Sequence, residues 1–202
     1  MAGRTPRIGV LALQGDFREH LAVLTGLGAD AHPVRRASEL GAADGLVIPG
    51  GESTVMDKLS RVFGLAGPLR AAIDAGLPVY GTCAGLILLA DRIDGAAPGQ
   101  QSIGGFDITV QRNAFGTQAE SFEADLTIET LGAPPVHAVF IRAPVITAAG
   151  PAVEALATLG DGRIVAARQG NLLGTSFHPE MNGETRFHEL FLDLVDTARE
   201  RR

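Results

Sequence analysis

The chain has one cysteine among its 202 residues, and this scarcity excludes several classes of protein. A single cysteine cannot form an internal disulfide, which fits a reducing compartment. No stretch approaches the ~20 consecutive apolar residues that cross a bilayer, and the apolar run after Arg7 stops at Gln14, too early for a signal peptide. These absences predict a cytoplasmic protein with no membrane partner.

Positive charge is also sparse. The chain carries 17 Lys and Arg against 23 Asp and Glu, which gives a net charge of −6 and an isoelectric point near 5.3. The sequence therefore lacks the basic surface that binds nucleic acid. A hydrophobic fraction of 46% is ordinary for a globular protein, and the length fits one domain over residues 1–202.

The first half of the chain alternates short apolar runs with stretches of helical periodicity. The runs predict strands at 7–13, 31–34, 45–49 and 78–82, and the periodic stretches predict helices at 17–27, 54–63 and 68–75. Continuous apolar strands suit a parallel sheet that is covered on both faces. This alternation predicts an α/β fold with a mainly parallel sheet.

The second half of the chain shows a different pattern of predicted elements. A Gly/Pro/Gln-rich loop over 93–105 is followed by predicted strands at 106–111, 122–128, 136–141, 153–159, 163–168 and 171–177, and by a helix over 184–199. We expect these strands to extend the sheet in antiparallel fashion, with the last helix packing back on it.

The single cysteine lies in a motif with chemical meaning. Cys83 stands in a Gly-x-Cys-x-Gly corner between the strand at 78–82 and an apolar run of helical length. A lone cysteine is usually a small buried hydrophobe, but such a corner exposes a nucleophile, and the start of a helix favours its thiolate. We therefore predict that Cys83 is a catalytic nucleophile.

A general base is predicted 95 residues later, at His178. This residue follows an apolar strand and precedes Pro179 and Glu180, and in an extended His-x-Glu both side chains point the same way. A carboxylate beside an imidazole fixes its tautomer, as in a catalytic triad. The other histidines (His20, His32, His137 and His188) are interpreted as surface or packing residues, and the lack of a His/Cys cluster argues against a metal site.

A glycine-rich loop at 49–54 ends the third predicted strand. Glu52 or Ser53 suits a helix cap there, while backbone N–H groups near Gly51 suit an oxyanion. Because strand ends line the ligand crevice of a parallel sheet, the second interpretation is favoured. Asp16 is predicted to cap the first helix and Gly28 to end it. The Gly-x-Gly-x-x-Ala at 26–31 follows a helix, so it does not indicate dinucleotide binding.

Together these motifs resemble class I (triad-type) glutamine amidotransferases. Within that family, the resemblance is closer to the glutaminase subunits of two-component pyridoxal 5′-phosphate synthases. The segments that carry it are Leu13-Gln14-Gly15-Asp16, Gly50-Gly51-Glu52-Ser53, Gly81-Thr82-Cys83-Ala84-Gly85, Arg112-Asn113-Ala114-Phe115-Gly116, Phe122-Glu123-Ala124-Asp125-Leu126, Ile141-Arg142-Ala143-Pro144 and His178-Pro179-Glu180.

The resemblance implies a role for each matched residue. Cys83, His178 and Glu180 would form the catalytic triad, and the backbone near Gln14, Gly51 and Ala84 would form the oxyanion region. Glutamine would be held by Gly51, Glu52, Ser53, Arg112, Ile141 and Arg142. A guanidinium suits the substrate carboxylate. The implied fold is a flavodoxin-like three-layer sandwich.

The resemblance also implies a partner and no cofactor or metal. Ammonia released from L-glutamine would pass to a (β/α)₈-barrel synthase subunit that makes pyridoxal 5′-phosphate, in a large hetero-oligomer. Three alternatives remain open from the residues alone. They are a glutaminase for another pathway such as histidine biosynthesis, a non-catalytic subunit of the same fold, and a cysteine-dependent protease or stress hydrolase.

Overall fold

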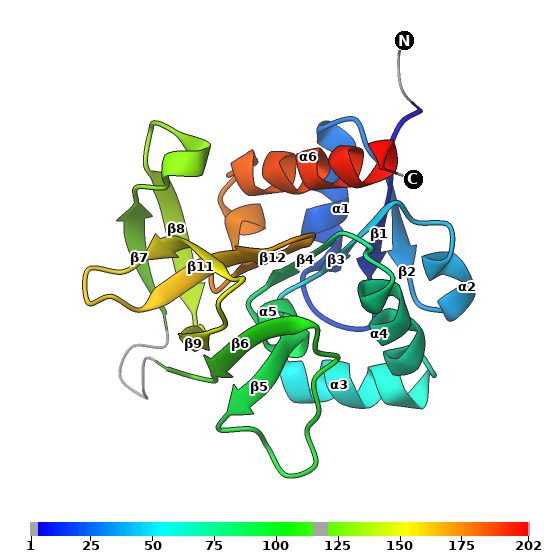
Figure 1. Ribbon diagram of the computed structural model, residues 1–202, viewed down its shortest axis with the longest axis horizontal. Helices are drawn as coiled ribbons and strands as arrows, with labels where there is room; N and C mark the ends of the chain where they lie inside the picture. The colour runs from blue at the N-terminus through cyan, green and yellow to red at the C-terminus, as the bar shows by residue number, and fades with distance from the viewer. Residues whose placement is uncertain (1–3, 115–120, 202) are drawn as a thin grey trace.

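A mixed β-sheet runs through the molecule, with helices on both of its faces (Figure 1). The computed structural model describes residues 4–114 and 121–201. Its strands are β1 (Arg7–Leu11), β2 (Asp30–Val34), β3 (Gly45–Ile48), β4 (Val79–Thr82), β5 (Ala90–Asp94), β6 (Phe106–Gln111), β7 (Ser121–Leu126), β8 (Val136–Ile141), β9 (Val145–Ala149), β10 (Glu154–Thr158), β11 (Ile164–Gln169) and β12 (Leu172–Thr175). Its α-helices are α1 (Phe17–Gly26), α2 (Ala37–Leu40), α3 (Ser53–Val62), α4 (Ala66–Asp74), α5 (Ala84–Leu89) and α6 (Arg186–Glu200), with 3₁₀ turns η1 (Glu129–Leu131) and η2 (Pro179–Met181).

One half of the sheet is parallel, as predicted. Its strands stand in the order β2-β1-β3-β4-β12, and every neighbouring pair is parallel. Strands β3, β4 and β12 are buried at every position, which explains their unbroken apolar sequences. The carboxyl ends of these strands consequently meet at one edge of the sheet.

The other half continues through β11, β9 and β6 in antiparallel pairs, which confirms the expected extension. Two details differ from the prediction. Strand β5 lies parallel to β6 in a segment expected partly as loop, and β7 and β8 form a separate two-stranded sheet. Strand β9 and the short helix α2 were not predicted.

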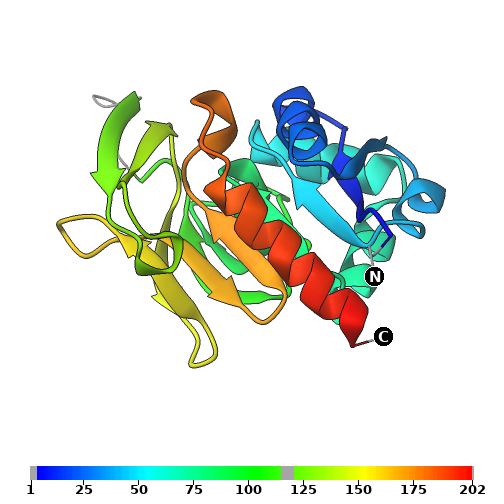
Figure 2. The same ribbon diagram turned by 90° about the horizontal axis from the view of Figure 1, so that it is seen from above.

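Two hydrophobic clusters hold the layers together. One packs α3, α4 and α5 against one face of the sheet, and the other packs α1, α6 and the β7–β8 hairpin against the opposite face. Figure 2 shows α6 lying across its face of the sheet. The result is the three-layer α/β sandwich that the sequence predicts.

Within the described ranges, every helix is too short or too polar to span a bilayer. Two residues of one matched motif, Phe115 and Gly116, lie outside the described residues.

Candidate active site

Sheet topology brings the nucleophile and the base together. Strands β4 and β12 are parallel neighbours, with Thr82 opposite Thr175. Cys83 follows β4 directly, and its backbone N–H donates to the carbonyl of Thr175 at 2.8 Å. His178 lies just beyond the end of β12, so two side chains 95 positions apart lie at the same edge.

The Cys83 corner has the strained backbone expected of a nucleophile on a tight turn. Cys83 has φ 48°, in the left-handed region that a residue with a side chain rarely adopts. A Cβ at Gly85 would lie 2.0 Å from the carbonyl oxygen of Ile48, so glycine there lets α5 pack directly on β3. Among the described residues other than glycine, only Cys83, Asn113 and Arg142 have positive φ, and all three line one cavity. Strain gathered in this way is typical of a functional site.

That cavity has a volume of about 370 Å³. Its lining includes nine predicted site residues, namely Gln14, Gly51, Glu52, Ser53, Cys83, Arg112, Ile141, Arg142 and His178. Four lining residues were not predicted to belong to the site: Asp16, Ile87, Asn113 and Met181. The sequence therefore identified most of the lining, although its members come from both halves of the chain.

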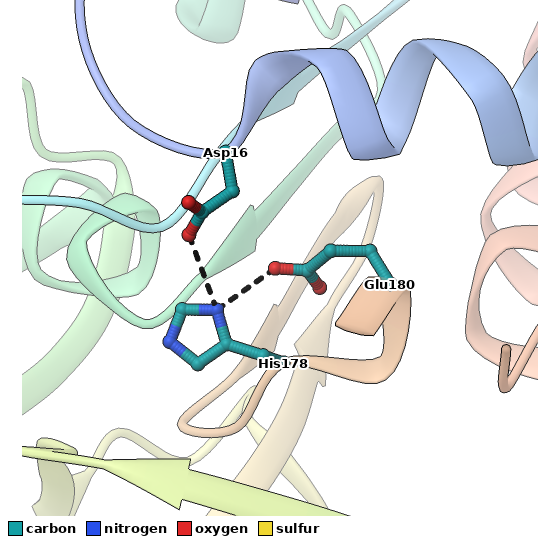
Figure 3. Close-up of side chains that lie close together, drawn as sticks. All are labelled: Asp16, His178 and Glu180. Atoms are coloured by element: carbon teal, nitrogen blue, oxygen red, sulfur yellow. Dashed lines mark hydrogen bonds and ion pairs between the residues drawn. The ribbon is translucent and has the colours of Figure 1, made fainter. Parts of the chain in front are cut away.

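His178 and Glu180 form the predicted pair, but through a different backbone. His178 Nδ1 lies 2.8 Å from Glu180 Oε1, as Figure 3 shows. The expected extended His-x-Glu is wrong, since Pro179 begins the 3₁₀ turn η2 and Glu180 lies within it. Proline fixes φ at a value suited to the first position of a turn. The turn carries the Glu180 side chain into the interior, where it is fully buried.

A second carboxylate reaches His178 from the cavity side. Asp16 Oδ2 lies 3.6 Å from His178 Nδ1 (Figure 3). Asp16 occupies the N-cap position of α1, as predicted, but its side chain makes no capping hydrogen bond. Partial burial raises the pKa of Asp16, and the nearby His178 charge acts against that increase.

The environment of His178 favours its protonated form. Burial by itself would lower the pKa of this imidazole, but hydrogen bonds to the side chains of Cys83 and Glu180, together with their negative charge, raise it to about 10. His178 is therefore protonated at neutral pH. An imidazolium beside sulfur stabilises a thiolate, which is the reactive form of cysteine.

The loop that follows β3 is held against the loop that follows β1. Glu52 N–H donates to Gln14 Oε1 at 2.8 Å, and Asp16 N–H donates to the Gly50 carbonyl at 3.1 Å. Gly51 has φ 151°, and a Cβ there would lie 2.5 Å from Gln14 Oε1. Glycine is thus required for Gln14 to approach this backbone.

Glu52 has the capping role that was considered less favoured, and it also lines the cavity. As the N-cap of α3, its carboxylate accepts from the N–H groups of Thr54 and Val55 at 3.2 and 2.8 Å. Its burial opposes ionisation, but these bonds, the Thr54 hydroxyl and the Arg112 charge lower its pKa. Ser53 begins α3 and is almost fully buried.

Arg112 reaches the cavity from the end of β6. Its guanidinium donates to Gln100 Oε1 at 2.6 Å and lies 3.4 Å from Glu52 Oε1. Gln100 Nε2 in turn donates to Ser53 Oγ at 3.0 Å. The loop at 94–105, which showed no functional signal in the sequence, therefore contacts two predicted glutamine-binding residues. An isolated glutamine in a loop carries no pattern that reveals such a role.

Two histidines interpreted as surface or packing residues lie behind the triad. His20 and His188 are fully buried, and their rings meet at 2.9 Å between His20 Nδ1 and His188 Nε2. Both lie on helices where their spacing predicts only an inward face. No feature of the sequence distinguishes an imidazole packed near Glu180 from one in ordinary core.

Of the described residues, Asp16, His178 and Glu180 form a group whose ligand atoms lie close enough to hold a metal ion, all within 4.8 Å. The same atoms are already used in the hydrogen bond and ion pair of the triad histidine. A metal would have to displace the Glu180 bond from Nδ1, so the geometry favours acid–base chemistry over metal binding.

Comparisons with known proteins agree with this geometry. The chain is 67% identical over 196 residues to the pyridoxal 5′-phosphate synthase subunit PdxT of Clavibacter michiganensis subsp. michiganensis, covering 97% of this chain and 94% of that protein. It is 67% identical over 195 residues to the protein of the same name from Leifsonia xyli subsp. xyli, covering 96% and 98%.

Solved structures show the same fold. A crystal structure of a glutamine amidotransferase matches with a TM-score of 0.87 at 49% identity, over 94% of this chain and 98% of the other. PurLQS from Thermotoga maritima matches with a TM-score of 0.67 at 19% identity, over 95% and 100%, and this likeness concerns the fold alone. Residues 10–197 match the SNO glutamine amidotransferase family. With that match and these relatives, the chain belongs to the SNO glutamine amidotransferase family.

Proposed function

We propose that residues 1–202 act as one glutaminase domain that hydrolyses L-glutamine to L-glutamate and ammonia. The observation that carries this proposal is the meeting of Cys83, His178 and Glu180 beside a cavity lined by Arg112 and Arg142. The family and the names of the relatives support the substrate.

The proposed reaction begins with attack of the Cys83 thiolate on the side-chain amide carbon of glutamine. His178, protonated at neutral pH, gives its proton to the departing nitrogen, and a γ-glutamyl thioester remains on Cys83. Water then attacks the thioester while His178 accepts a proton, and glutamate leaves. Glu180 holds the imidazole in place and stabilises its charge in both steps.

Backbone N–H groups of Gly51 and Ala84 are proposed to stabilise the oxyanion. Gln14 supports this role because its side-chain oxygen, Oε1, accepts a hydrogen bond from the Glu52 N–H and so holds the peptide that follows Gly51. One such donor typically contributes about 3–4 kcal/mol to transition-state stabilisation.

Substrate recognition is assigned to the opposite wall of the cavity. The guanidinium groups of Arg112 and Arg142 suit the α-carboxylate of glutamine, because Arg offers two parallel donors to a carboxylate. Gly51, Glu52, Ser53 and the backbone of Ile141 complete this wall in the proposal.

The partner is proposed to be a synthase subunit of (β/α)₈-barrel fold that makes pyridoxal 5′-phosphate, joined in a large hetero-oligomer. Relatives at 67% identity bear the name of a synthase subunit. Ammonia released into solvent is protonated and lost, so a direct transfer between subunits is chemically reasonable. We place the docking surface on α3, whose first residue, Ser53, lines the cavity and on which Val55, Val62 and the adjacent Phe63 expose large apolar side chains.

The chain is proposed to work in the cytoplasm. Its single cysteine is the nucleophile, which must stay a free thiol to react, and the cytoplasm keeps thiols reduced.

The test is ammonia release from L-glutamine with and without the synthase subunit of a close relative. We expect slow hydrolysis by the chain alone, clear stimulation by the synthase, and none by Cys83→Ala in either condition. Because Cys83→Ala keeps the cavity wall, it should still bind glutamine in calorimetry. Hydrolysis that survives in Cys83→Ala would refute the assigned nucleophile, and stimulation by an unrelated synthase would refute the pathway.

A further inference from the structure

A buried cluster of polar side chains lies directly behind the triad. His20 on α1 meets His188 on α6 at 2.9 Å through Nδ1 and Nε2. The other ring nitrogen of His20, Nε2, lies 3.2 Å from Thr82 Oγ1 on β4 and 3.6 Å from Glu180 Oε1. Both histidines and Thr82 are fully buried. Three elements, α1, β4 and α6, therefore converge on the inner side of Glu180.

Both imidazoles of this cluster are neutral. Burial lowers the pKa of His20 well below its usual value, and the neighbouring charges of His188 and His178 lower it further. Burial likewise lowers the pKa of His188 to about 4, against a smaller opposing effect of Glu184. Each ring therefore carries one N–H group. Which nitrogen carries the proton decides whether a donor or an acceptor faces Glu180.

The hydrogen-bond partners indicate which nitrogens carry the protons. His188 Nδ1 is buried without a hydrogen-bond partner among the described residues. A buried N–H without an acceptor is rarer and more costly than an unused lone pair. His188 is therefore protonated on Nε2, which donates to His20 Nδ1. This bond leaves the His20 proton on Nε2, facing Thr82 and Glu180.

Glu180 needs such a donor. Its side chain is fully buried, and its second oxygen, Oε2, has no hydrogen-bond partner among the described residues. Two imidazole nitrogens face Oε1: His178 Nδ1 is within hydrogen-bond distance at 2.8 Å, whereas His20 Nε2 lies 3.6 Å away and is itself hydrogen-bonded to Thr82 Oγ1 at 3.2 Å. An ionised carboxylate away from water is costly unless donors surround it.

We propose that His20 is a positioning residue for catalysis: its Nε2–H, anchored on Thr82 and directed toward Oε1 at 3.6 Å, stabilises the Glu180 carboxylate against His178 electrostatically, while His188 fixes the His20 tautomer. This inference rests on the proposed function, in which Glu180 orients the base. His20 does not touch substrate and acts only through Glu180. A neutral donor suits this role, because a cation there would compete with the His178 imidazolium for the same oxygen.

Two substitutions at position 20 separate this role from packing. His20→Gln can place an amide N–H near the Nε2 position, whereas His20→Asn is too short to reach Glu180 and keeps its amide near His188. The readout is the rate of Cys83 alkylation by iodoacetamide at pH 6 in the full-length chain, which has one cysteine. This rate reports the thiolate, so it does not depend on which substrate the enzyme uses.

We expect His20→Asn to slow alkylation roughly 10- to 100-fold, as is common when a residue that orients an active-site group is removed. His20→Gln should stay within about threefold of the wild-type rate, since the donor is restored. At pH 9 the variants should converge, because an ordinary thiol ionises near pH 8.5 without help. In the synthase-stimulated glutaminase assay, kcat of His20→Asn should fall while KM stays unchanged.

The control is Tyr80→Phe, which removes a buried hydroxyl of the same region that bonds to Thr175 and not to Glu180. It should leave the alkylation rate unchanged. In a Glu180→Gln background, His20→Asn should cause no further slowing, whereas an independent packing defect would add its own effect.

Equal rates for His20→Asn and the wild type at pH 6, or equal slowing by Asn and Gln, would overturn the proposal. If His20→Asn does not fold, His188→Leu replaces it. That variant keeps His20 but removes the donor to its Nδ1, so alkylation should slow about threefold, and an unchanged rate would contradict the role. Absence of glutaminase activity in the wild type would refute the proposed function while the alkylation test still decides the role of His20.

Discussion

His178 lies between two environments that differ sharply. On its outer side is a cavity lined by charged groups, including Asp16, Arg112 and Arg142. On its inner side, behind Glu180, lie His20 and His188, which are neutral and fully buried. Charged side chains line the cavity, where solvent can balance them, whereas neutral imidazoles lie on the interior side of Glu180. In the proposed function, the cavity side binds substrate and the interior side positions the base.

The largest expected effect comes from the interior carboxylate. Glu180→Gln keeps the shape of the side chain but removes the charge that supports the His178 imidazolium, so kcat should fall roughly 10²- to 10⁴-fold. Since Glu180 helps raise the pKa of His178 to about 10, the loss of activity at alkaline pH should begin at a lower pH in this variant. Measurements of kcat across pH 6–11 with the synthase present give both the fall in kcat and the pH at which activity is lost.

The matched variant is Asp16→Asn, which neutralises the other carboxylate near His178, on the cavity side. Its side chain is partly exposed and lies 3.6 Å from Nδ1, against 2.8 Å for Glu180. We expect a change in kcat below about fivefold, because an exposed charge is screened by solvent. Equal losses of kcat in Asp16→Asn and Glu180→Gln would contradict the distinction between the cavity side and the interior side of His178.

A smaller effect, on binding, is expected at the cavity wall. Arg112→Ala should raise KM for glutamine about 10- to 100-fold through loss of charged hydrogen bonds, with little change in kcat. Arg92→Ala is the control, since its guanidinium pairs with Asp107 away from the cavity. A fall in kcat with KM unchanged would place Arg112 in the chemistry instead of in substrate binding.

Substitution of Gln100 should also raise KM, but by less than substitution of Arg112. Gln100→Ala removes the link between Arg112 and Ser53, so KM should rise about 3- to 10-fold, the effect of one or two hydrogen bonds. Gln101→Ala tests the specificity of this result, because the bond that Gln101 makes to Asp57 uses its backbone. Identical KM values for both variants would show that the loop has no part in binding.

A further expected effect is on stability instead of kinetics, and it concerns the interior alone. The pKa of His188 is about 4 in the folded chain and near its ordinary value of 6.5 when unfolded. Between these values only the unfolded chain binds the proton, so stability falls as pH drops from about 6.5 to about 4 and this contribution then levels off.

His188→Gln cannot titrate, so its free energy of unfolding should depend less on pH in this interval, by an amount on the order of a few kcal/mol. Urea unfolding at pH 7, 5.5 and 4.5 measures the difference between the two proteins. Parallel pH profiles would show that His188 is protonated in the folded state or accessible to solvent.

The parallel half of the fold was predictable because its sequence signals are local. Strands such as β3 and β4 are buried on both faces and therefore read as unbroken apolar runs. Strand β5, by contrast, has the sequence Ala-Asp-Arg-Ile-Asp and stands at the end of the sheet order. An edge strand with exposed charged residues carries no such run, which is why it was taken as partly loop.

The residues of the site likewise divide into those that local sequence reveals and those that it does not. Short motifs contain Cys83, His178 and Glu180, and the neighbouring residues in each motif indicate its chemistry. Gln100, His20 and His188 are not revealed in this way, since each acquires at least one partner from an element 47 or more positions away. Asp16 was assigned a helix cap from local sequence, yet the fold turns its side chain toward His178.

The sequence by itself determined which groups are available for chemistry and the alternation of strands and helices that carries them, because both follow from residue type and short-range spacing. Only the tertiary structure decided that β4 and β12 are neighbours, which places sulfur and imidazole at one sheet edge. It alone also decided that two neutral histidines lie behind Glu180. Contacts of this kind depend on how whole elements pack, and the free energy of packing is shared over many residues that no single motif records.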